Sequence, residues 1–182
     1  MTQFEFVQVT VAIILGLGLT DILRSLGEQF RRRREIDVSW LQIGASCLLL
    51  LVILIYLWSF WLAAEVTWTL PLFMMQAASA IALALSAQFI KVDLSSGKTL
   101  DAQYFDNRTA TFVLWAMGPL FAVFFSIATG NVSGADAGRI GAAILLISLG
   151  IIKNRTYHKV VLIVLLLLAT VVHLIVGLFE LR

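Results

Sequence analysis

The sequence predicts an all-α protein, a polytopic bundle of six transmembrane helices forming a single domain over residues 1–182. Hydrophobic residues make up 60% of the chain and charged residues only 13%, whereas an average globular domain is roughly 25% charged. Apolar runs long enough to span a bilayer recur between the charged residues, since about 20 residues cross about 30 Å of hydrocarbon. Cys47 is the single cysteine, which excludes an intrachain disulfide scaffold.

The apolar segments between charged residues predict the helices in order. The six candidates are approximately Phe4–Leu23, Val38–Ala64, Trp68–Ile90, Thr109–Thr129, Arg139–Ile152 and Val160–Phe179. We expect the first helix to continue beyond the membrane through the arginine-rich segment 24–37. The fifth is short, with 13 residues between Arg139 and Lys153. It spans fully if those side chains reach the interface or if the helix begins near Ala135; a re-entrant segment is the alternative.

The distribution of basic residues predicts the orientation. Eleven of the 13 Lys and Arg residues lie on one side of the six predicted spans: Arg24, Arg31, Arg32, Arg33, Arg34, Lys91, Lys98, Arg108, Lys153, Arg155 and Lys159. Because positive residues stay cytoplasmic, both termini should face outward, N-out and C-out. Trp58, Trp61 and Trp68 then fall at the outer interface and Trp40 at the inner one, as an aromatic belt requires.

Small residues at a spacing of four predict which helices pack closely. The stripes are Gln8, Ala12, Gly16 and Thr20; Gln76, Ala80, Ala84 and Gln88; Gly118, Ala122, Ser126 and Gly130; and Ala169, His173 and Gly177. We therefore expect the first, third, fourth and sixth helices to form the inner bundle. The leucine-rich second helix should face lipid.

Polar side chains within the spans are the candidate functional residues. Gln8, Tyr56, Gln76 and His173 form a predicted polar intramembrane layer, and Asp21, Arg24 and Gln88 a predicted cytoplasmic mouth. Ionisable groups inside a membrane are costly and mark functional hypotheses. The alternatives are interhelical hydrogen bonds for His173 and the amides and an ion-paired helix end for Asp21, Arg24 and Glu28.

Four consecutive arginines, Arg31, Arg32, Arg33 and Arg34, follow the first span. They suit the anionic headgroups of the cytoplasmic leaflet, although the same residues also serve as the topology signal. A net charge of +2 offers no second basic surface, so no nucleic acid partner is expected.

The sequence contains no recognisable catalytic motif, and we expect neither an enzyme nor a bound metal or other cofactor. His158 and His173 lie fifteen residues apart on one predicted helix, about 22 Å along its axis, so they cannot ligate one haem. Cys47 lies in an apolar run without an evident base.

Three features carry a resemblance to a known group: Gly16–Thr20 closing the first helix, the Arg31–Arg34 run, and Tyr104–Arg108 before the fourth helix. Their order resembles a widespread group of small, uncharacterised bacterial multi-helix membrane proteins, over about the first two-thirds of the chain. The resemblance implies a multi-pass protein of the bacterial inner (plasma) membrane.

The first functional hypothesis is a small homo-oligomeric channel or transporter-like protein, whose path the polar layer lines. The second is a non-catalytic accessory subunit that docks by small-residue faces onto a larger membrane complex. An intramembrane lipid-modifying enzyme is a third. The direction of the small-residue stripes separates the first two, because a stripe left facing lipid needs a partner chain.

Overall fold

The computed structural model describes residues 2–34, 37–60, 64, 66–93 and 97–180, with side chains described up to Thr170. Over these residues the chain forms helices and no strands. The helices are α1 (Gln3–Arg31), α2 (Trp40–Ser59), α3 (Leu70–Ile90), α4 (Leu100–Ala128), α5 (Gly134–Ile151) and α6 (Arg155–Glu180). Helices α1 to α5 are each long and apolar enough to cross a membrane. The predicted all-α, multi-pass class is confirmed to this extent.

Helices α4 and α5 begin where a side chain caps their first turn, and not at the charged residues that bound the apolar spans. Helix α4 starts at Leu100 instead of Thr109, because the Thr99 side chain accepts a hydrogen bond from the Ala102 amide. Helix α5 starts at Gly134, where the Asp136 carboxylate accepts the Ser133 amide at 2.9 Å. The 18 residues of α5 make it long enough to span, as expected for a start near Ala135.

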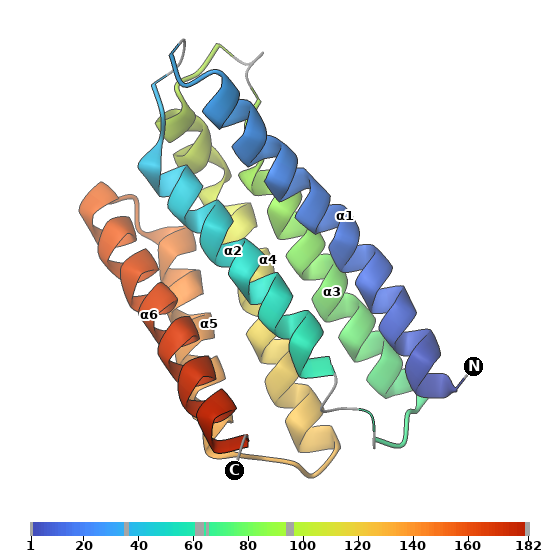
Figure 1. Ribbon diagram of the computed structural model, residues 1–182. Helices are drawn as coiled ribbons and strands as arrows, with labels where there is room; N and C mark the ends of the chain where they lie inside the picture. The colour runs from blue at the N-terminus through green and yellow to red at the C-terminus, as the bar shows by residue number, and fades with distance from the viewer. Residues whose placement is uncertain (1, 35–36, 61–63, 65, 94–96, 181–182) are drawn as a thin grey trace.

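Four helices form a row, and two lie across one side of it (Figure 1). In the row α1 packs against α3, α3 against α4, and α4 against α5. Helix α2 packs against α1, α3, α4 and α6, and α6 also touches α5. The start of α1 and the end of α6 lie at one end of the bundle, here the termini end. The opposite end, where the α1–α2, α3–α4 and α5–α6 connections lie, is here the basic end.

Small residues allow close approach within the row, as the stripes of the third and fourth helices predict. A Cβ on Gly18 would lie 3.0 Å from the Ala84 Cα, and one on Gly118 would lie 3.2 Å from a Leu83 methyl carbon. Ala80 is completely buried. These contacts hold α3 in the middle of the row.

The predicted packing face of the first helix and the predicted lipid exposure of the second helix are both wrong. Helix α1 buries Val7, Val11, Leu15, Gly18 and Ile22, so its predicted packing stripe turns outward instead. Helix α2 buries Leu41, Leu48, Leu49 and Ile53, because it covers the row and touches four other helices. A leucine-rich helix fits this place because its buried aliphatic side chains join the hydrophobic core of the bundle.

Two further expectations also fail. The described part of α6 exposes large apolar residues such as Val160, Ile163 and Leu167, so α6 is peripheral rather than internal. Trp68 is only 6% exposed, since it stacks on Phe60 and touches Phe125. Trp40 and Trp58 are exposed as an aromatic belt requires, and Trp61 lies outside the described residues.

Candidate functional site

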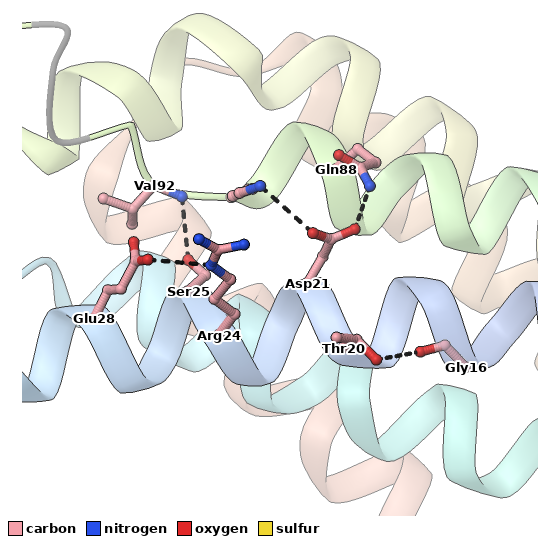
Figure 2. A network of polar contacts seen from close by, with 9 residues as sticks. Gly16, Thr20, Asp21, Arg24, Ser25, Glu28, Gln88 and Val92 are labelled. Carbon is pink, nitrogen blue, oxygen red and sulfur yellow. Dashed lines mark hydrogen bonds and ion pairs between the residues drawn. The ribbon is translucent and has the colours of Figure 1, made fainter.

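A charged and polar cluster joins α1 to the end of α3 near the basic end (Figure 2). The Asp21 carboxylate accepts a hydrogen bond from the Gln88 side-chain amide and lies 3.5 Å from the Lys91 ammonium nitrogen. Asp21 and Gln88 are predicted to lie together, and the structure brings them into contact. Lys91, which follows α3, is the residue of this cluster that was not predicted.

Arg24 points along α1 rather than toward this carboxylate. Its Nε donates to Glu28 at 3.3 Å, an i,i+4 pair, whereas the cation beside Asp21 is Lys91 of another helix. The expected Arg24–Glu28 pair is therefore confirmed, and the expected pairing of Asp21 with Arg24 is wrong. Asp21 ties two helices together instead of closing one helix end.

Amide and hydroxyl side chains hold the chain where α3 ends. The last carbonyls of a helix lack intrahelical partners. Gln42 of α2 donates to the Ile90 carbonyl at 2.8 Å, and Asn107 of α4 donates to that of Phe89 at 3.1 Å. Ser25 of α1 accepts the Val92 amide at 3.1 Å (Figure 2). Three helices thus converge on one helix terminus.

The predicted intramembrane layer is only partly assembled. Tyr56 of α2 donates a hydrogen bond to the Gln76 side-chain oxygen of α3. Gln8 is partly exposed and makes no hydrogen bond to any described residue. The side chain of His173 lies outside the described residues. The layer therefore contains one closed Tyr–Gln pair, with Gln8 on the outer side of α1.

A buried histidine at the basic end, His158, is not among the predicted site residues. His158 of α6 is completely buried; its Nδ1 lies 2.8 Å from the Tyr104 hydroxyl of α4, and its Nε2 lies 2.7 Å from the Ile152 carbonyl. A neutral imidazole satisfies both contacts when Nε2 carries the proton and Nδ1 accepts from the hydroxyl. Phe105 and Phe112 make T-shaped contacts with the His158 ring. His158 therefore joins α4, the end of α5 and α6.

The remaining predicted residues, Arg31 to Arg34, are exposed around the end of α1. A second polar feature of the basic end is a cavity of about 270 Å³ lined by Asp37, Thr99, Asp101 and Arg155, in which Arg155 and Asp101 pair at 3.0 Å. Within the described chain, His, Cys, Asp and Glu side chains form no group of three that could hold a metal ion.

Chemically, these clusters hold helices together. The contacts of Asp21, Gln42, Asn107 and His158 join helix to helix, and the Asp21 and Asp101 carboxylates are matched by Lys91 and Arg155. The outward stripe of α1 is a surface feature of the described chain without an internal role. No protein-family model, curated protein or solved structure matches this chain.

Proposed function

We propose that this protein is a non-catalytic membrane subunit that assembles with another transmembrane chain through the outward stripe of α1. The outward stripe comprises Gln8, Ala12, Gly16 and Thr20. Ala12 and Thr20 are exposed, and a Cβ on Gly16 would meet no heavy atom of another part of the described chain within 4 Å. This free surface at Gly16 is the observation that carries the proposal.

An exposed glycine in a membrane helix has a free-energy cost, so such a stripe indicates a helix partner. A glycine inside a helix costs about 1 kcal/mol relative to alanine, and lipid offers nothing to offset that cost. A close helix neighbour does, because small residues let two backbones approach and gain van der Waals contact. Gln8 and its unused amide add a hydrogen-bonding group on the same stripe, for which hydrocarbon has no partner.

The partner is a second copy of the chain or a subunit of a larger complex of the bacterial inner membrane. Both use the same chemistry, a transmembrane helix presenting small residues at a spacing of four. Native mass spectrometry of protein extracted with its surrounding lipid separates them, since a homo-oligomer has a mass that is a multiple of one chain.

Gly16→Leu tests the proposal against a matched control, Gly44→Leu. Gly44 is an exposed glycine of α2 whose Cβ would likewise meet nothing within 4 Å. Gly16→Leu should abolish the assembled mass while the unfolding midpoint of the single chain does not fall, because no internal contact is disturbed. Gly44→Leu should keep the assembled mass. Assembly that survives Gly16→Leu would contradict the proposal.

A homo-oligomeric channel is the second candidate, favoured by the Tyr56–Gln76 pair between α2 and α3. In this case Gln76→Leu, compared with wild-type protein in vesicles, should change ion or solute flux at equal protein content. Ser59→Ala, an exposed hydroxyl close in sequence to Tyr56, serves as the control. Unchanged flux in Gln76→Leu would contradict the channel, and the subunit would remain as the proposed function.

A further inference from the structure

The end of α1 carries a cluster of four exposed cations. Arg31 is the last residue of α1, and Arg32, Arg33 and Arg34 form the turn that follows. None of their side chains makes a hydrogen bond or an ion pair with another described residue. This cluster, Arg31–Arg34, is here the arginine run. It lies beyond the outward stripe of α1, so it concerns a different surface from the proposed assembly.

Four other cations of the basic end are paired with carboxylates. The ion pairs are Arg24 with Glu28, Lys91 with Asp21, Lys98 with Asp106 and Arg155 with Asp101. The charges of these cations are therefore balanced within the chain. The segment 31–37, in contrast, has four arginines against two acidic residues, Glu35 and Asp37, which leaves a net charge of +2. Much of the unbalanced positive charge of the basic end thus lies in the arginine run.

The position of the arginine run along α1 places it at the surface of a bilayer. Arg31 lies eight residues beyond Leu23, where the predicted first span ends, or about 12 Å along the helix axis. The headgroup layer on each side of the hydrocarbon is about 5–8 Å deep. The run therefore lies at the outer edge of this layer, and long arginine side chains can bring their charges back to the lipid phosphates.

Trp40 supplies an independent observation. It is the first residue of α2 and is 72% exposed. Tryptophan rings favour the headgroup depth of a membrane, so Trp40 marks the level at which α2 enters the bilayer. The connection from α1 to α2 thus carries the arginine run and then returns to the interface. It presents cations and an exposed aromatic ring, which suit the charged and apolar parts of one phospholipid.

We infer that the arginine run and Trp40 bind an anionic phospholipid of the leaflet at the basic end, and that the preferred lipid carries two phosphates, as cardiolipin does. Guanidinium groups bind phosphate through paired hydrogen bonds, and four successive arginines offer more donors than one phosphate accepts. The net charge of the segment matches two phosphate charges. The Trp40 ring lies against the glycerol and the upper acyl chain, a contact that a soluble diphosphate does not provide.

Arg33→Gln combined with Arg34→Gln tests the headgroup contact. Both residues are exposed, so the unfolding midpoint should not fall. Cardiolipin binding should weaken about 30-fold, because each arginine near an anionic surface contributes about fivefold. The measurement is native mass spectrometry of the full chain titrated with lipid. Arg33→Lys combined with Arg34→Lys keeps the charge and the topology signal, and its affinity should stay within about fivefold of wild type.

Lys153→Gln combined with Lys159→Gln is the matched control. It removes the same two charges from exposed residues of the basic end, near the start of α6, which α2 separates from α1 in Figure 1. Charges beyond about 8–10 Å are screened, so the affinity should change by less than about threefold. An equal loss in the two glutamine variants would show diffuse surface charge instead of a site, and an equal loss in the lysine variant would show that charge is not what binds the lipid.

Trp40→Ala tests the apolar contact and should weaken cardiolipin binding about fivefold. Trp58→Ala is its control and should have no effect, because Trp58 is equally exposed, at 75%, but lies at the other end of α2. A Trp40→Ala variant that binds as tightly as wild type would contradict the part assigned to this ring.

The choice of lipid tests the ligand class. Wild-type protein should bind cardiolipin more tightly than phosphatidylglycerol, and phosphatidylglycerol more tightly than phosphatidylcholine. Equal affinity for cardiolipin and phosphatidylglycerol would overturn the assignment of two phosphates, and equal affinity for all three lipids would overturn the site. Displacement of cardiolipin by an equal concentration of pyrophosphate or of a single-stranded DNA oligonucleotide would assign the arginine run to a soluble polyanion instead.

Discussion

His158 shows what a single buried polar side chain does in this bundle. Both ring nitrogens have partners, the Tyr104 hydroxyl and the Ile152 carbonyl. Removing one partner of a buried polar atom costs its full desolvation penalty, about 1–3 kcal/mol. The free energy of unfolding therefore depends on the Tyr104 hydroxyl of α4.

Tyr104→Phe should lower the free energy of unfolding by about 1–3 kcal/mol, because the ring packing stays while Nδ1 of His158 loses its donor. The measurement is the unfolding midpoint of the purified protein in detergent, and a loss of several degrees is expected. Tyr157→Phe is the control, since its hydroxyl bonds to Ser148 in a partly exposed place where water can replace it. Equal losses in both variants would show that the His158 contact has no special weight.

The sequence placed Tyr56 and Gln76 in one layer correctly, because counting from helix midpoints fixes depth. It missed Tyr104 and His158 because both precede the predicted spans 109–129 and 160–179, where they looked like loop residues. Charges end an apolar span but not a helix, and capping by Thr99 and Asn154 extends α4 and α6 to include them. Contacts between helix starts therefore need the three-dimensional structure.

At the scale of the element, two of the glycines of α1, Gly16 and Gly18, have opposite surroundings. A Cβ on Gly18 would lie 3.0 Å from the Ala84 Cα, whereas a Cβ on Gly16 would meet no other part of the described chain within 4 Å. Periodicity reveals both positions but does not tell which face of the helix turns inward, since each face carries small residues. This ambiguity is the reason why the packing of the first helix was predicted on the wrong side, and with it the lipid exposure of the second.

Gly18→Ala and Gly16→Ala should accordingly have opposite effects on a single chain. At Gly18 the methyl group meets the α3 backbone, so α1 and α3 must separate, and a loss of about 1–3 kcal/mol is expected. At Gly16 the helix gains up to about 1 kcal/mol from the better helix former. Unfolding midpoints in a detergent that keeps the chain monomeric compare the two. A lower midpoint for Gly16→Ala would contradict the outward direction of this stripe.

At the scale of the whole molecule, an even number of antiparallel helices puts the start of α1 and the end of α6 at the same end (Figure 1). Eleven of the 13 basic residues of the sequence belong to connections and helix ends at the opposite end. Because such residues stay in the cytoplasm, the termini end should face outward.

Cysteine labelling in intact cells measures this orientation directly. Cys47→Ala removes the single native thiol. In that background Asn131→Cys, in the exposed α4–α5 connection, should react with a membrane-impermeant maleimide from outside. Asp37→Cys, exposed in the α1–α2 connection, should react only after the membrane is permeabilised. Equal labelling of both variants in permeabilised cells controls for thiol reactivity. The reverse pattern would put the arginine run outside and contradict the predicted orientation.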